Sequence, residues 1–214
     1  MKPYKTTQGE SSASYEIQRS KFYTHTKHVE SEEEARAFIQ EQKKAYFDAR
    51  HNCSAYVLGY DGAKQKSNDD GEPGGTAGNP ILDAIKKNEL TDIVVVVTRY
   101  FGGIKLGAGG LIRAYSHSAV LGLEAADIAL MLPLAVVRVR VSYDLLASVE
   151  NYLRKKELRT GDKAYAEDVT VDVLLREEEK EDVLAALTDL TSGRARYEDA
   201  GTQVMAVPVP RASS

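Results

Sequence analysis

The chain has 214 residues, 43% of them apolar, which is enough to form one large domain or two compact ones. Its net charge is −4 at pH 7, and neither the part before Pro133 nor the part after it is basic, which argues against a general nucleic-acid binder and leaves only a local basic patch for such contacts. Its apolar runs are shorter than the roughly 20 residues needed to cross a bilayer, and its single cysteine, Cys53, permits no internal disulfide, so we expect a cytoplasmic protein.

The first predicted elements are an extended stretch and a helix. Tyr15–Val29 has the composition of extended chain. Ser31 and the three glutamates that follow it resemble a capping box, with acidic side chains near the positive end of a helix dipole. We expect this helix to continue to about Tyr46.

Strands and a short helix are predicted next. Cys53–Tyr60 has the composition of a strand. Asn79 as N-cap and Pro80 at the first helical position predict a short helix. Ile93–Thr98 gives the clearest strand signal, because its continuous β-branched run indicates burial on both faces.

The pattern changes at Pro133. A helix rich in small residues is predicted after Gly107, and beyond Pro133 valines alternate with Arg138 and Arg140, as in a half-exposed strand. The elements predicted after this strand are a helix from Asp144, strands near Leu158–Ala166 and Val169–Leu175, a helix at Glu177–Thr191 and a last strand around Gln203–Val207. The resulting order, βαββαβ, is that of a ferredoxin-like unit.

Two glycine-rich stretches, Ser67–Pro80 and Thr98–His117, are the most informative parts of the chain. The first carries three acidic residues, whereas the only full charges between Ile93 and Leu123 are positive. Long glycine-rich loops lose much entropy on folding and are uncommon in compact domains unless they bind something. We therefore expect the functional site here.

These stretches also carry a family resemblance. S-N-D-D-G-E-P-G-G-T-A-G at Ser67–Gly78 and V-T-R-Y-F-G-G-I-K-L-G-A-G-G-L-I-R-A-Y at Val97–Tyr115 closely resemble the IMPACT/YigZ family, and Ala49–Tyr56 resembles its histidine-cysteine strand entry. The likeness covers both domains expected of bacterial members. It implies an α+β protein in which residues 1–132 have the β/α fold shared with a small-subunit ribosomal protein domain and the fourth domain of elongation factor G. Residues 133–214 are then a ferredoxin-like domain that resembles the last domain of that factor.

The resemblance further implies a role in translation, because the two domains match adjacent domains of a ribosome-binding factor and eukaryotic members are linked to control of translation initiation through a kinase activator. We therefore predict a non-enzymatic accessory factor in translation regulation or stress response, which binds the ribosome, RNA or a translation regulator and needs no cofactor or metal. The alternative is an enzyme or sensor for a small phosphorylated ligand held between the two glycine-rich loops.

The predicted binding surface is the second glycine-rich loop. It leads into a helix N-terminus, where unpaired N–H groups favour an anion, and an aromatic beside it is suited to stack on a base. The residues expected to bind RNA, a partner or phosphate are Arg99, Tyr100, Gly102, Gly103, Lys105, Gly107, Gly109, Gly110 and Arg113. The family-motif loop opposite consists of Asp69, Asp70, Gly71, Glu72, Gly74, Gly75, Thr76 and Gly78. Neither a Walker A ending nor a dinucleotide fingerprint is present.

Structural roles for the same residues remain open. The acids of the first loop and the cations of the second are suited to pair and hold the loops together. The first loop lacks the ligand spacing of an EF-hand, and His51 and Cys53 lack the further ligands of a zinc deaminase. We expect structural roles for these two residues, and a solvated position for His117.

Overall fold

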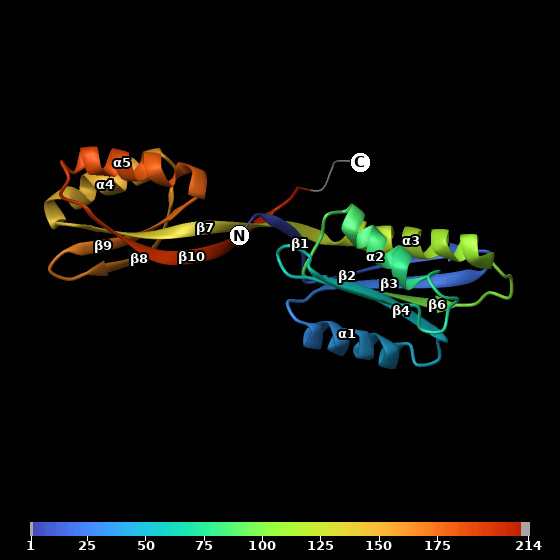
Figure 1. Cartoon of the computed structure of the whole chain (residues 1–214). Helices are drawn as coiled ribbons and strands as arrows, with labels where there is room; N and C mark the ends of the chain where they lie inside the picture. Colours follow the sequence, from blue (N-terminus) through green and yellow to red (C-terminus); the bar gives the residue numbers. More distant parts are fainter. Residues whose placement is uncertain (1, 211–214) are drawn as a thin grey trace. The chain divides into compact units, whose positions relative to one another are not determined.

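The computed structural model describes residues 2–210 and divides the chain into two compact units. The first unit ends at Met131 and takes up the chain again at Ala206, and the second unit is Leu132–Met205. Helices and strands are mixed in both, which confirms the α+β fold class (Figure 1). None of the described helices is long and apolar enough to span a membrane.

The first unit is built on a five-stranded sheet with the order β2-β3-β6-β4-β5, in which every neighbouring pair is antiparallel. Its strands are β2 (Glu10–Ile17), β3 (Ser20–His28), β4 (His51–Leu58), β5 (Lys64–Asn68) and β6 (Ile93–Tyr100). The central strand, β6, is buried from Ile93 to Arg99, as its β-branched run predicts. β2 and β3 form a hairpin whose turn residues Gln18 and Arg19 both have positive φ.

Helices cover both faces of this sheet. Helix α1 (Glu32–Ala45) lies on one face, and α2 (Gly78–Lys87) and α3 (Gly107–Ala125) lie on the other (Figure 1). The predicted cap of α1 is confirmed, because the Ser31 side chain accepts a hydrogen bond from the Glu34 N–H. Gly122 allows α3 to approach the sheet closely, since a Cβ there would lie 2.4 Å from Cγ2 of Thr24.

The start of α2 differs from the sequence prediction. The N-cap position is Ala77, not Asn79, and the side chain of Asn79 accepts a hydrogen bond from Ser67 instead. The carboxylate of Asp69 caps the helix from outside, accepting from the N–H groups of Ala77 and Gly78. A distant acid therefore replaces the local cap that the Asn-Pro pair indicated.

The two compact units divide between Met131 and Leu132, beside Pro133, although a single strand continues through this boundary. Strand β7 (Asp127–Val141) continues through it: Asp127–Met131 pair with β1 (Tyr4–Gln8), and Ala135–Val141 pair with β9 (Val169–Leu175). Pro133 lies between these two paired segments.

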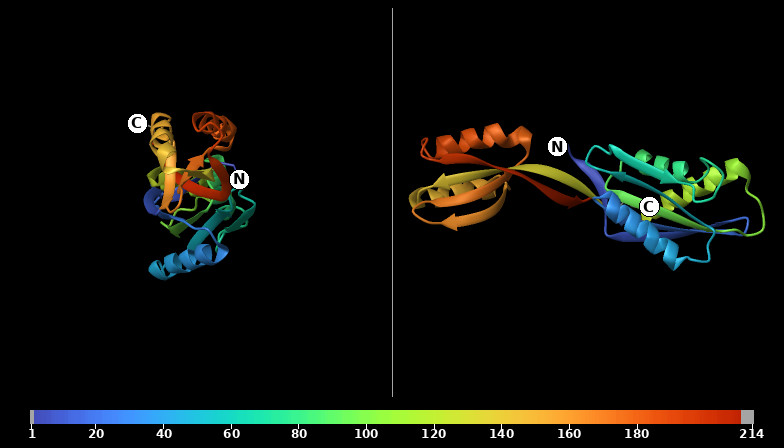
Figure 2. Two further views of the ribbon diagram at one scale, coloured as in Figure 1. Left: turned by 90° about the vertical axis from the view of Figure 1, so that its left-hand side faces the viewer. Right: turned by 60° about the horizontal axis from the view of Figure 1, so that its bottom comes forward.

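The second unit has the predicted order βαββαβ, and its sheet order is β8-β9-β7-β10. Helices α4 and α5 lie side by side (Figure 2), and one core cluster, made largely of valines, joins them to the strands. Beside β7 and β9, its elements are α4 (Tyr143–Lys155), β8 (Arg159–Tyr165), a 3-10 turn (Glu177–Glu179), α5 (Lys180–Leu190) and β10 (Arg196–Pro208). The last strand thus begins seven residues before the predicted Gln203.

Candidate functional site

The first glycine-rich loop is folded around Asp69. Its carboxylate accepts hydrogen bonds from the N–H groups of Gly75 (2.8 Å), Ala77 (3.1 Å) and Gly78 (2.8 Å). Burial alone would raise the pKa of Asp69, but the three backbone donors have the larger combined effect. The pKa of Asp69 therefore lies below its ordinary value. The N-terminus of α2 is therefore already occupied by an anion of the chain itself.

Glu72 of the same loop forms a buried ion pair with Arg99. The two side chains are only 4% and 7% exposed, and Nη1 of Arg99 lies 2.8 Å from Oε1 of Glu72. The Tyr115 hydroxyl donates to the same oxygen at 2.6 Å, and burial raises the pKa of Tyr115. Arg99 was predicted to contact a partner, but its burial removes it from the surface and shows that this pair of charges joins the two loops.

The remaining polar residues around the first loop also bind one another. Asp70 accepts from Nζ of Lys43 (2.6 Å) and from the backbone N–H of Asn52 (2.7 Å). The Cys53 thiol donates to the Asp69 carbonyl at 2.9 Å, and burial strongly raises its pKa, which makes it a poor nucleophile. His51 lies 3.0 Å from the Asp70 carbonyl. Within residues 2–210, no group of three His, Cys, Asp or Glu side chains is placed to hold a metal ion.

The rest of the family-motif loop provides backbone shape. Gly71 and Gly75 have positive φ (89° and 77°), which favours glycine. The Thr76 hydroxyl donates to the Pro73 carbonyl at 2.6 Å, and Gly74 is exposed. The loop is thus held by its own hydrogen bonds.

The second glycine-rich loop is exposed. Lys105 and Arg113 are both exposed, and neither forms an ion pair within the described part of the chain. Gly103 and Gly107 have positive φ (89° and 70°), and no side chain caps the N-terminus of α3. Gly109 and Gly110 lie in the first turn of that helix.

Gly102 fixes where this loop lies. A Cβ at Gly102 would lie 2.0 Å from the carbonyl carbon of Arg19, so the loop is in direct contact with the β2–β3 turn. The Gly102 N–H also donates to the Ser20 hydroxyl at 3.2 Å. Arg19, which the sequence prediction missed, is exposed at this place.

Exposed apolar side chains accompany these cations. Phe101, Ile104 and Ile112 are 54%, 44% and 43% exposed. We call the whole set the basic loop surface, which comprises Arg19, Phe101, Ile104, Lys105, Ile112 and Arg113.

Tyr100 and His117 lie outside this surface. The Tyr100 hydroxyl donates to Asp48 at 2.6 Å, and this bond raises the pKa of Tyr100 to about 12. Its ring makes edge contacts with Tyr23 and Tyr46, so it belongs to an aromatic cluster. His117 is exposed and packs edge-on against the ring of Tyr15 at 4.6 Å.

Comparison with known proteins gives matches to both halves of the chain. Residues 18–123 match the family described as the Impact N-terminal domain, and residues 139–194 match a domain of unknown function, DUF1949. The chain is 44% identical to IMPACT family member YvyE of Bacillus subtilis (84% of this chain, 82% of the relative) and 33% identical to IMPACT family member YigZ of Escherichia coli (83% and 88%). The crystal structure of a hypothetical protein is similar, with a TM-score of 0.61, 30% identity and coverage of 93% of this chain and 98% of that one.

Proposed function

The chain belongs to the IMPACT family, and on this basis we propose that it is a non-enzymatic accessory factor in translation, which binds RNA on the ribosome through the basic loop surface. Membership in the family supports a regulatory or accessory role in general. Within such a role, binding is what the arrangement of the glycine-rich loops supports best.

The proposal rests mainly on the observation that Lys105 and Arg113 form no ion pair within the described residues. Lys105 and Arg113 are exposed, have no carboxylate between Ile93 and Leu123, and form no ion pair with any residue that the structure describes. Cations in this state are suited to neutralise phosphates and release counterions. Phe101, exposed between the strand and the loop, offers a ring on which a base stacks.

The loop is held in place before any partner arrives. The buried pair of Arg99 with Glu72 fixes the end of β6, and the guanidinium of Arg99 lies 5.5 Å from the centre of the Phe101 ring. Gly102, which follows Phe101, is held in place by its contact with Arg19. A loop ordered in advance loses less entropy on binding, which favours recognition of a structured surface.

The alternative, a phosphorylated ligand between the two loops, has less support. The N–H groups at the start of α2 donate to Asp69, and Arg99 is paired with Glu72. Both groups that would hold a phosphate there already have an anionic partner within the chain.

Co-sedimentation with purified ribosomes over a salt series tests the proposal. We expect the variant Lys105→Ala/Arg113→Ala to bind at least about tenfold more weakly at moderate salt, and its salt slope to fall by about two, because two phosphate contacts are lost. The matched control is Lys86→Ala/Lys87→Ala, which removes the same charge from the exposed end of α2. Equal binding by both variants and the wild type would contradict the proposal.

A further inference from the structure

The face of the first sheet that carries α1 is only half covered. Helix α1 packs on β4 and β6, and Val96 of β6 belongs to the core cluster beneath it. On β3, His25 pairs with Val96, so His25 and Tyr23 lie on this same face. Their partners on the edge strand β2 are Ser12 and Ser14, which are both exposed. These small side chains leave the β2–β3 half of the face open to a partner.

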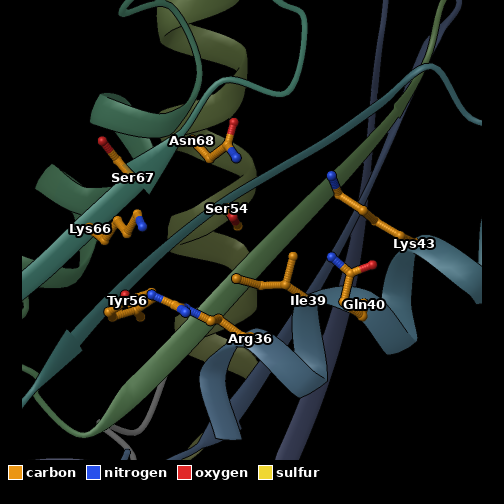
Figure 3. A pocket seen from close by; sticks show the side chains of 9 residues that line it. All are labelled: Arg36, Ile39, Gln40, Lys43, Ser54, Tyr56, Lys66, Ser67 and Asn68. Atoms are coloured by element: carbon orange, nitrogen blue, oxygen red, sulfur yellow. The ribbon is translucent and has the colours of Figure 1, made fainter. Parts of the chain in front are cut away.

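Polar side chains also gather on the covered half of this face, but most of them bind within the chain. Figure 3 shows this place, a hollow between α1 and the strands β4 and β5. The Tyr56 hydroxyl donates to Glu32 at 2.9 Å, and Arg36 lies 3.5 Å from the same carboxylate. Lys43 lies 2.6 Å from Asp70. These contacts hold α1 against the sheet and the first glycine-rich loop, which is a structural role.

Three tyrosine rings pack together at the end of the open half. Tyr23 of β3, Tyr46 at the end of α1 and Tyr100 of β6 have ring centres between 5.8 and 6.5 Å apart. All three are half-buried, so each exposes part of its side chain to solvent. Aromatic side chains on the face of a sheet are the means by which RNA-recognition motifs stack unpaired bases. The open half therefore has the kind of surface on which bases stack.

Phe47, which follows Tyr46, is the most exposed large apolar side chain among the described residues, at 84%. Its two neighbours in the chain are both held. The Tyr46 hydroxyl lies 2.8 Å from Nε2 of His25, and the Tyr100 hydroxyl donates to Asp48 at 2.6 Å. Phe47 is thus presented in a fixed place, and a group ordered in advance loses less entropy on binding. We call the four aromatic residues the aromatic platform, which comprises Tyr23, Tyr46, Phe47 and Tyr100.

Cations accompany the aromatic platform. Lys21 of β3, Lys44 near the end of α1 and Arg50 just before β4 are all exposed. None of these three forms an ion pair within residues 2–210. The acids nearby are Glu16, which is opposite Lys21 in the β2–β3 hairpin, and Asp48, which accepts the tyrosine hydrogen bond described above. The platform therefore combines rings for bases with unpaired cations for phosphates, whereas an acidic peptide would use only the cations.

We propose that the aromatic platform binds single-stranded RNA, with an unpaired base stacked on Phe47 and the flanking phosphates beside Lys21 and Arg50. A duplex keeps its bases stacked inside and cannot use the rings. This assignment rests on the proposed function, and it names single-stranded RNA as the ligand. The platform and the basic loop surface lie at the same end of the sheet, since Phe101 directly follows β6 and Arg19 lies two residues before Lys21. One strand of several nucleotides therefore contacts both.

The test is fluorescence anisotropy of the full chain with a labelled oligouridine of about 12 nucleotides and, in parallel, with an RNA duplex of the same length. We expect Phe47→Ala to raise the Kd for the single strand at least about fivefold and to leave the Kd for the duplex within about twofold, because only unpaired bases stack on the ring. Phe47→Trp should restore binding of the single strand. The matched control is Tyr60→Ala, which removes another exposed ring (49%) at the turn between β4 and β5 and should leave both Kd values within about twofold.

The salt dependence separates the rings from the cations. Lys21→Ala should lower the salt slope of oligouridine binding by about one, because one phosphate contact is lost. Phe47→Ala should leave the slope unchanged, since a stacked base releases no counterion. Because Phe47 is exposed, its variants are expected to keep the melting curve of the wild type.

The outcomes distinguish this proposal from the proposed function. If Lys105→Ala/Arg113→Ala weakens binding of the oligouridine and Phe47→Ala does not, the proposed function stands and the platform is not part of the site. An equal loss of single-strand and duplex binding in Phe47→Ala would exclude base stacking. Displacement of the oligouridine by an oligoglutamate of equal charge at equal concentration would assign the platform to an acidic peptide instead. Failure of the wild type to bind either RNA would overturn both proposals.

Discussion

The two glycine-rich loops of the first unit look alike in composition but are built for different purposes. In the loop around Asp69 and Glu72 the charges are hydrogen-bonded within the chain, and Glu72 is buried. In the loop between Phe101 and Gly110 the glycines are exposed or half-buried, and Lys105 forms no ion pair within the described residues. Glycine content alone therefore does not mark a binding site.

The difference lies in where each loop's anions and cations find partners. The acidic loop lies beside a helix N-terminus and a buried arginine, so its carboxylates are neutralised internally. The basic loop contains no carboxylate, and of its three cations only Arg99, at its base, forms an ion pair within residues 2–210. This comparison predicts that changes in the first loop alter stability and that changes in the second alter binding.

The largest expected effect is that of Glu72→Ala. Removing Glu72 leaves Arg99 buried without its counter-charge and the Tyr115 hydroxyl without its acceptor, so we expect a loss of about 3–5 kcal/mol in the free energy of unfolding, measured with urea. Glu72→Ala/Arg99→Met is the control, because removing both charges should recover much of this loss. A loss below about 1 kcal/mol for the single variant would show that the pair does not hold the loops.

The next largest effect is expected at Gly102. Its Cβ would lie 2.0 Å from the Arg19 carbonyl carbon, so Gly102→Ala must displace the loop or the hairpin turn, and we expect a loss of about 1–3 kcal/mol. Gly109→Ala serves as the matched change, since its Cβ meets only the end of the Arg113 side chain at 3.5 Å and alanine favours the helix. Equal thermal stability of the two variants would refute the close contact.

Asp69→Asn should have a smaller effect, of about 1–2 kcal/mol, because the amide oxygen still accepts hydrogen bonds but without charge. The lowered pKa of Asp69 determines how the stabilising effect of this carboxylate depends on pH. Its contribution to stability is present above the ordinary value of 3.8 and is lost as the pH falls from there through the native pKa. Urea denaturation across this range should therefore show a flatter acid profile for Asp69→Asn than for the wild type. Identical profiles would contradict the assignment.

Much of the fold could be predicted because its signals are local. The β-branched run at Ile93–Thr98, the Ser31 cap and the order βαββαβ each depend on neighbouring residues, and the structure contains all three. The continuation of β7 through Pro133 could not be predicted, because the strands that pair with it on either side of the proline, β1 and β9, are distant in the sequence. The prediction of Asn79 as the N-cap was wrong, because the carboxylate of Asp69, eight residues before Ala77, accepts the hydrogen bond from the helix N-terminus instead.

The candidate site was harder to predict, since it depends on contacts across the sheet. Arg99 meets Glu72 over 27 positions of the chain, and nothing in the spacing shows this. Arg19 joins the basic loop surface only because β2 and β3 form a hairpin, whose turn has no Asn-Gly signal.

The smallest effect on stability is expected for Lys105→Ala/Arg113→Ala. Both side chains are exposed and unpaired within the described residues, so we expect a change within about 0.5 kcal/mol in the free energy of unfolding in urea. The same variant is expected to lose ribosome binding, so the two measurements together separate a binding loop from a structural one. A loss above about 1 kcal/mol would instead mean that these cations hold the loops together, as Arg99 does, and would remove the ground for placing a partner there.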